Sequence, residues 1–181
     1  AHAEATAYDV RIPLSYVTAA NQGHVLELVT EFATIQLPGD MLHNLVSQTD
    51  KELLVKVEKR SSSQFNSHVL TASIGNRPMI DASLELDGKP LSHLEFHAPV
   101  SIEIPYKPSA AESADPSFIK IWYIQDNGSW TPIEPSQYVS DKHAVEFTTN
   151  HFSTYAVTYY EGFKDLADFG WAEKEIRFLR A

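Results

Sequence analysis

The chain has 181 residues, of which 43% are hydrophobic and 11% aromatic, a composition typical of a folded globular protein with a sizeable core. Its net charge of −10 and the lack of any Lys- or Arg-rich cluster argue against a nucleic-acid-binding or anionic-lipid-binding surface. The sequence has no cysteine, which excludes a disulfide, a thiolate metal site and a cysteine nucleophile. No apolar run approaches the roughly 18 residues of a membrane helix.

Most of the chain alternates apolar and polar residues with a period of two, which is the pattern of half-buried β-strands. Turn sequences such as Asp87-Gly88 separate neighbouring segments. We therefore expect about nine or ten short strands at hairpin spacing, in an all-β sandwich. The predicted strands are Tyr8–Leu14, His24–Val29, Ala33–Pro38, Leu53–Glu58, Ser83–Leu86, Val100–Tyr106, Phe118–Ile124, Ala144–Phe147 and Thr154–Tyr159.

Two short helices are expected among these strands. One is predicted at Ser15–Gln22 and the other at Asp40–Ser47, where Asp40 is a candidate N-cap. Two polar stretches, Ser61–Gln64 and Pro108–Pro116, predict exposed loops. The apolar residues of the second helix that would face the core are Leu42, Leu45 and Val46.

The period changes to that of a helix in the last segment, Phe163–Ala181. This segment holds four acidic and four basic residues, whereas residues 1–162 hold 20 acidic and 10 basic residues. We therefore predict two units, a β-domain over residues 1–162 and a helical stub over residues 163–181. Because the chain stops within this helical pattern, we expect it to be a piece of a longer protein.

The motifs of the stub resemble the opening of a bacterial S-layer homology repeat. They are Phe163-Lys-Asp-Leu166, Trp171-Ala172 and Ile176 followed by Leu179. In that family the repeats anchor proteins to secondary cell-wall polymers, and the polymer-contacting helix follows later in each repeat. The resemblance covers 19 residues, about a third of one repeat, so binding of the polymer would need repeats that this chain lacks.

The preceding β-domain is similar to domains found just upstream of such repeats in surface proteins and secreted enzymes of Gram-positive bacteria. The similar stretches are Ile102–Tyr106, Trp122–Ile133 and Phe147–Val157. The last of these also resembles the final strand of ZU5-type and GAIN-type domains, some of which cleave themselves. The resemblance implies an immunoglobulin-like or ZU5-like sandwich with one or two short helices and a C-terminal helical stub.

One tripeptide, His151-Phe152-Ser153, carries a candidate chemistry. With His151 as base, the Ser153 hydroxyl would attack the Phe152 carbonyl, and the resulting ester would be hydrolysed by water. This reaction also needs a strained peptide bond. The alternative is a turn in which Phe152 enters the core and Ser153 bonds locally, and we favour it.

A metal site is conceivable at His93, Glu95 and His97, which would share one face of a strand. Because no fourth ligand is identifiable, we favour exposed strand histidines. Aromatic residues suggest another possibility, since Trp122 and Trp130 flank a hairpin and sugar rings stack on exposed tryptophans. Packing of these side chains across strands is the simpler interpretation.

The sequence thus predicts a non-catalytic structural spacer in a secreted, cell-wall-anchored surface protein of the S-layer type. It assigns no catalytic, cofactor-binding or metal-binding residue and expects no enzyme activity, no nucleic-acid partner and no membrane insertion. Two alternatives stay open. One is an autoproteolytic domain that cleaves at Phe152-Ser153, and the other is a carbohydrate-binding accessory module with a polysaccharide partner.

Overall fold

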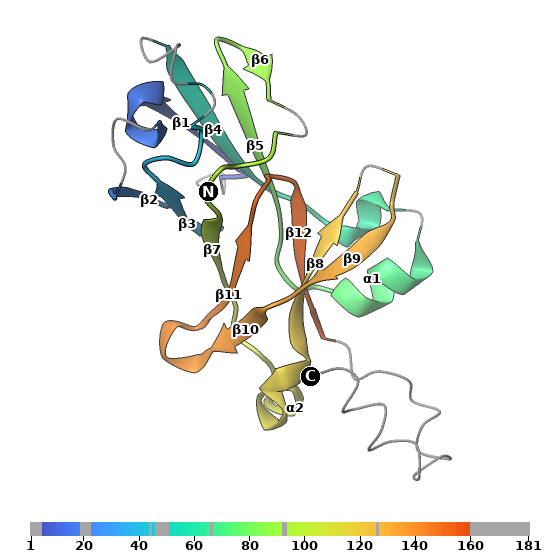
Figure 1. Ribbon diagram of the computed structural model, residues 1–181. Helices are drawn as coiled ribbons and strands as arrows, with labels where there is room; N and C mark the ends of the chain where they lie inside the picture. The colour runs from blue at the N-terminus through green and yellow to red at the C-terminus, as the bar shows by residue number, and fades with distance from the viewer. Residues whose placement is uncertain are drawn as a thin grey trace.

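The chain folds as an all-β sandwich of two antiparallel sheets, as the alternation predicts (Figure 1). The computed structural model describes residues 5–18, 23–43, 45, 51–65, 67–91, 94–125 and 127–159. The predicted boundary at residue 162, and the whole S-layer-like stub after it, lie outside the described residues. No helix in the described ranges is long and apolar enough to cross a membrane.

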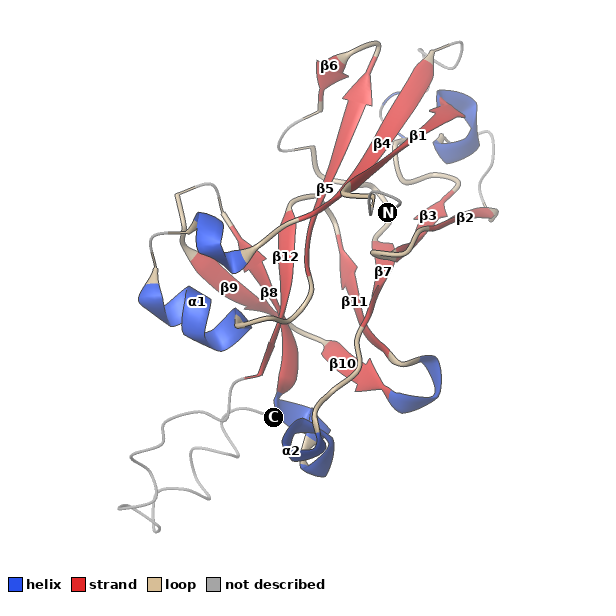
Figure 2. Cartoon of the chain, turned by 180° about the vertical axis from the view of Figure 1, so that it is seen from behind, coloured by secondary structure: helices blue, strands red, loops and turns tan. Residues whose placement is uncertain are grey.

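The first sheet has seven strands in the order β1-β4-β5-β12-β8-β9, with β6 paired to the outer end of β5. The last strand of the described residues, β12, therefore lies in the middle of the sheet, between β5 and β8 (Figure 2). The strands are β1 (Ala7–Pro13), β4 (Glu52–Lys59), β5 (Met79–Leu86), β6 (Lys89–Pro90), β8 (Ile119–Ile124), β9 (Trp130–Ile133) and β12 (Thr154–Tyr159).

The second sheet has five strands in the order β10-β11-β7-β3-β2, which leaves β2 at an edge. In its central strand, Val100, Ile102 and Ile104 are fully buried. The intervening residues are only partly buried, so the period-two alternation of the sequence separates the core face from the outer face. The strands are β2 (Val25–Val29), β3 (Thr34–Pro38), β7 (Val100–Pro105), β10 (Ser136–Val139) and β11 (Ala144–Thr149).

The two sheets are joined directly where the chain passes from β9 to β10. Only Glu134 and Pro135 separate these strands, although β9 belongs to the first sheet and β10 to the second. The buried Ser136 hydroxyl then accepts a hydrogen bond from the Ile121 amide of β8 at 3.1 Å. A side chain thus links the backbones of the two sheets at this end of the sandwich.

A second hydrophobic cluster lies apart from the main core and includes residues of α1 (His68–Ile74). Leu70 and Ile74, one helical turn apart, are both fully buried in it beside Trp122 and Ala156 of the first sheet. The first sheet is therefore buried on both faces around β12. This helix is not among the predicted elements, because its β-branched residues and single inward pair give almost no helical periodicity.

The short helices differ from prediction in four places, one of which is the predicted exposed loop Ser61–Gln64, where η4 (Ser62–Gln64) forms and Ser62 is buried. A 3-10 helix, η1 (Leu14–Val17), takes the place of the first residues of the predicted helix Ser15–Gln22, whose residues 19–22 lie outside the described residues. Turns occupy Asp40–Leu42, and no α-helix is present in the described part of the second predicted helix. The predicted loop Pro108–Pro116 contains α2 (Ala110–Ala114), with Ser109 as its N-cap. The remaining short helices are η5 (Pro116–Phe118) and η6 (Ser140–Lys142).

Tertiary context explains these differences. Leu42 is buried as predicted, and Met41 is buried beside it, but both reach the core from a turn held by the Leu42 amide, which donates to the Val17 carbonyl at 2.8 Å. The structure also describes twelve strands, more than predicted, because β6, β9 and β10 are too short or too polar to show the alternation.

Truncation of the central core is expected to be costly. Ile102→Ala should lower the free energy of unfolding by about 2–5 kcal/mol, because Ile102 is fully buried between the two neighbouring strands of β7. The control Val29→Ala removes an exposed apolar side chain and should change it by less than about 0.5 kcal/mol. Urea unfolding followed by circular dichroism measures both.

Candidate functional site

The turn between β11 and β12 contains the His151-Phe152-Ser153 tripeptide, and its backbone is held by several hydrogen bonds. The His151 carbonyl accepts from the Tyr155 hydroxyl at 2.5 Å and from the Thr149 hydroxyl at 2.9 Å. The Ser153 carbonyl accepts from the Ala82 amide of β5 at 2.9 Å. The turn is therefore fixed on both sides of the Phe152-Ser153 bond.

The Phe152 side chain is placed as in a turn that leads into a core strand. Phe152 is partly buried against the main core, and its ring meets the Phe96 ring edge-on at a centroid distance of 5.0 Å. Positive φ at a non-glycine residue occurs, among the described residues, at Asp87 and His143 and not in this turn. Backbone strain of that kind is absent at the bond that self-cleavage would break.

The His151 imidazole has an unusual environment. Its Nε2 atom is buried and has no hydrogen-bond partner among the described residues, and its ring packs edge-on against Tyr123 at 4.9 Å. Burial lowers the pKa of His151, and the charge of Glu95 opposes this effect only in part. The imidazole is therefore neutral near pH 7, as a base must be, but no described hydrogen bond joins it to the Ser153 hydroxyl. Self-cleavage stays a hypothesis.

The predicted histidine cluster is only partly described, because His93 lies outside the described residues. His97 packs against His43, with ring centroids 5.0 Å apart. Over the described ranges, no three His, Asp or Glu side chains are grouped closely enough to hold a metal ion.

The two tryptophans considered for sugar stacking lie on each other. Trp122 of β8 and Trp130 of β9 are parallel within 6°, with ring centroids 3.9 Å apart. Trp122 is buried in the cluster beside α1, whereas Trp130 is 37% exposed. One face of the Trp130 ring is thus used in packing, as the structural interpretation of the sequence expects.

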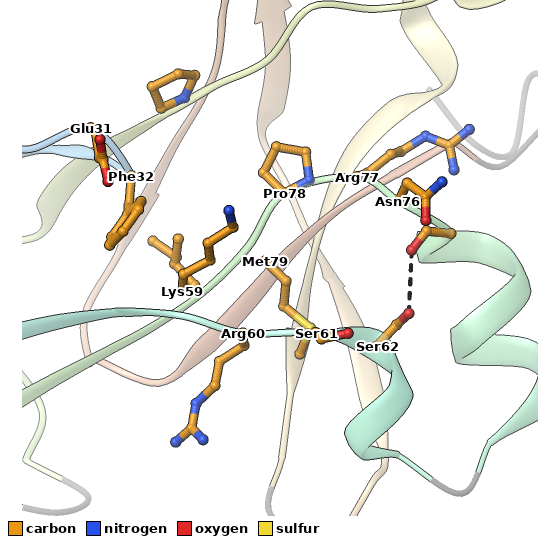
Figure 3. A pocket seen from close by; sticks show the side chains of 13 residues that line it. Glu31, Phe32, Lys59, Arg60, Ser61, Ser62, Asn76, Arg77, Pro78 and Met79 are labelled. Carbon is orange, nitrogen blue, oxygen red and sulfur yellow. Dashed lines mark hydrogen bonds between the residues drawn. The ribbon is translucent and has the colours of Figure 1, made fainter. Parts of the chain in front are cut away.

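A groove of about 590 Å³ opens between the ends of the sheets and is bordered by β4, the turn before β3 and the segment from α1 to β5 (Figure 3). Glu31 and Lys59 both line it, so its charge is mixed. Lys59 extends between Phe32 and Pro78, whereas the Arg60 guanidinium points away from them (Figure 3). Arg77 and two serines also line the groove, and the Ser62 hydroxyl donates to the Gly75 carbonyl at 3.2 Å.

A buried ionic cluster lies beside this groove. Both Nε and Nη2 of Arg77 lie 2.6 Å from the same carboxylate oxygen of Glu112. That oxygen also accepts from the Tyr106 hydroxyl at 2.7 Å, and the other accepts from the Ser109 amide at 2.7 Å. Arg77 lies over the Tyr159 ring at 5.7 Å as well. The cluster therefore connects the loop after α1, the start of α2 and the end of β12.

This network shifts the pKa values of its members. Burial alone would raise the pKa of Glu112, but the hydrogen bonds from Tyr106, Ser109 and Arg77 outweigh it and lower the pKa to about 2. Burial and the neighbouring carboxylate raise the pKa of Tyr106 to about 12. Every polar atom that faces the carboxylate is thus a donor, and the arrangement is that of a structural ion pair.

Sequence reasoning missed this cluster, although part of it has a local signature. Ser109 and Glu112 form a capping box, in which the serine hydroxyl accepts from the Glu112 amide and the glutamate side chain accepts from the Ser109 amide. Ser-x-x-Glu therefore signals the start of α2. The partners Arg77 and Tyr106 come from distant elements and leave no local signal.

Comparisons of the chain with models of known protein families and with curated proteins gave no match.

The Glu112 cluster predicts an acid-labile contribution to stability. Because the folded pKa lies below the ordinary value, this contribution is present above pH 4.5 and is lost as the pH falls towards 2. Over that range the free energy of unfolding of the wild type should fall by about 1–3 kcal/mol more than that of Glu112→Gln. Equilibrium unfolding in urea at a series of pH values measures the difference. Identical pH profiles would contradict the ion pair.

His151 predicts a loss of stability in a separate pH window. Because its folded pKa is lowered, the unfolded chain binds the proton first, and stability should fall as the pH drops below about 6.5. His151→Phe keeps a ring against Tyr123. It should therefore abolish the part of the stability loss between pH 7.5 and pH 5.5 that comes from protonation of His151. His68→Gln, which changes an exposed histidine, should retain it.

Proposed function

We propose that the described domain is a non-catalytic structural module that holds the segments on its two sides at a fixed separation. The observation that carries this proposal is that β1 and β12, the first and last strands of the described residues, belong to the same sheet. A rigid connection between the two ends of a module is the physical property that a spacer needs.

The register of the first sheet defines that separation. Ala7 pairs with Glu58, Glu58 with Asp81, and Asp81 with Thr154, so the start of β1 and the start of β12 share one row. The chain leaves β12 at Tyr159, at the far end of that strand. With strands about 4.8 Å apart and about 3.3 Å per residue, Ala7 and Tyr159 are separated by about 20 Å.

That distance changes only if a ladder of hydrogen bonds breaks. β4 and β5 pair along seven positions, and β12 is held by β5 on one side and by β8 on the other. Cooperative loss of the sheet would be required before the two ends separated further. The module therefore transmits force or orientation between its neighbours.

The setting of the module is proposed from the sequence. Because Phe163–Leu179 resembles the opening of an S-layer homology repeat, we place the domain in a secreted, wall-anchored surface protein of a Gram-positive bacterium. Contact with the secondary cell-wall polymer would then occur through repeats beyond this chain. The immunoglobulin-like or ZU5-like resemblance belongs to the same proposal.

Autoproteolysis at Phe152-Ser153 is the second candidate, and one observation favours it. His151 combines a lowered pKa with a buried ring nitrogen that has no partner in the described residues, which are properties of an uncharged base. A denaturing intact-mass measurement on fresh and aged protein separates the two candidates. The spacer predicts one mass, whereas cleavage predicts two fragments that Ser153→Ala abolishes.

The rigidity of the module is directly testable because the chain has no cysteine. Spin labels on Ala7→Cys and Ser117→Cys, at exposed positions near the two ends, should give one narrow distance distribution by double electron–electron resonance. The control pair, Glu52→Cys and Glu58→Cys, lies on the single strand β4. The width of its distance distribution therefore reports the mobility of the labels themselves. A clearly broader or bimodal distribution for the first pair would contradict a spacer.

The cellular setting needs its own measurement. An antibody against the chain should label intact cells of the organism that makes it, and brief trypsin treatment of those cells should remove the signal. Labelling only after the cells are permeabilised would overturn the proposed surface location and leave the rigidity result unaffected.

A further inference from the structure

The edge strand β2 presents an unusual combination of backbone and side-chain groups. Val25 and Val29 are 61% and 70% exposed, and they are two of the four large hydrophobic residues exposed in the described part of the chain. Glu27 lies between them on the same face and is exposed as well. The strand reads Val-Leu-Glu-Leu-Val, which is the same in both directions.

The hydrogen-bond pattern shows which backbone groups of β2 point away from the sheet. The Gly39 amide donates to the His24 carbonyl at 2.7 Å, and the Thr30 amide donates to the Ala33 carbonyl at 3.0 Å. In an antiparallel pair such hydrogen-bonded positions alternate with non-bonded ones, so the even-numbered residues of β2 face β3. Pro38, which has no amide hydrogen, accordingly lies opposite Val25 at a non-bonded position.

The amides and carbonyls of Val25, Glu27 and Val29 therefore point outward at the open edge. The structure pairs β2 only with β3 across the described ranges. An extended segment of another chain can form backbone hydrogen bonds with these three alternate residues and so add a strand to the sheet.

Each of the other described edge strands contains a proline or lies against a strand of the other sheet, and β2 does neither. β1 carries the exposed ion pair of Arg11 with Glu52 and ends in Pro13. β9 has Pro132 at its centre, and the short β10 lies against β8, where Lys120 donates to the Ser136 carbonyl at 3.4 Å. Proline is a common means of protecting a sheet edge, because it removes a backbone donor.

Charge selects the occupant of this edge. A second copy of the chain would fit the symmetric strand in backbone terms, because an antiparallel β2–β2 pair centred on Glu27 sets Val25 opposite Val29. It would also set the two Glu27 carboxylates directly opposite each other, and like charges at such a position are destabilising. A segment with Lys or Arg at the centre and β-branched residues two positions away on each side removes that conflict.

We propose that β2 is a docking edge for an extended segment of a partner protein with an apolar–basic–apolar pattern at alternate positions. The segment adds an antiparallel strand to the second sheet. Its backbone bonds to Val25, Glu27 and Val29, its basic residue pairs with Glu27, and its flanking side chains cover the two valines.

The test uses two peptides that differ at one residue. Acetylated and amidated heptapeptides of sequence SVLKLVS and SVLELVS are titrated into ¹⁵N-labelled chain at pH 7, and amide shifts report the binding site. The lysine peptide should bind roughly five to ten times more tightly than the glutamate peptide. It should also shift the Val25, Glu27 and Val29 amides and slow their hydrogen exchange.

The Glu27→Lys variant should reverse this preference, because its charge is exchanged while both valines remain. A mixture of wild type and Glu27→Lys should form heterodimers by analytical ultracentrifugation, whereas each protein alone stays monomeric. Glu27→Pro removes one outward donor and should weaken both the peptide binding and the mixed dimer, provided that its amide spectrum shows an intact fold.

Three results would overturn the proposal. The first is no shift of the β2 amides with either peptide, or shifts confined to another surface. The second is equal affinity for the two peptides, which would remove the role of Glu27. The third is dimerisation of the wild type through β2 at pH 7, which would assign the edge to a second copy of the chain.

Discussion

The position of β12 between β5 and β8 is the constraint on which the rest of the domain depends. Four consecutive residues of β12, Tyr155–Thr158, are buried, and their side chains point alternately to opposite faces of the sheet. Tyr155 and Val157 reach the core between the sheets, and Ala156 reaches the cluster beside α1. Neither hydrophobic cluster is complete until the last described strand is in place.

This arrangement bears on both candidate functions. In a spacer, insertion of β12 joins the two ends of the module through the ladder that runs from β1 through β4 and β5 to β12. In an autoproteolytic domain, the break would fall just before β12, and its pairing with β5 and β8 would keep the two fragments together. The Arg77–Glu112 cluster reinforces the other end of β12, because Arg77 lies over the ring of Tyr159.

Some of the acidic side chains form ion pairs with a nearby lysine, whereas others have no cationic partner among the described residues. Lys142 pairs with both Glu103 and Glu146 on the outer face of the second sheet, and Lys56 pairs with Glu85 at 2.6 Å on the first. Glu27 has only an amide partner, Gln36, at 3.4 Å among the described residues. Glu27 therefore differs from the paired carboxylates, because it lies between two exposed valines and has no cationic partner among the described residues.

Period-two alternation by itself determined the all-β class and the place of most strands. Successive side chains of a strand point to opposite faces of the sheet, so the pattern depends only on neighbouring residues. The sequence also predicted that Phe152 enters the core, and its ring packs there against Phe96. Only the tertiary structure decided the order of the strands, the helix His68–Ile74 and the burial of Glu112. These features depend on contacts between residues that are distant in sequence, such as those of Arg77 and Tyr106 with the Glu112 carboxylate. Local periodicity does not predict such contacts.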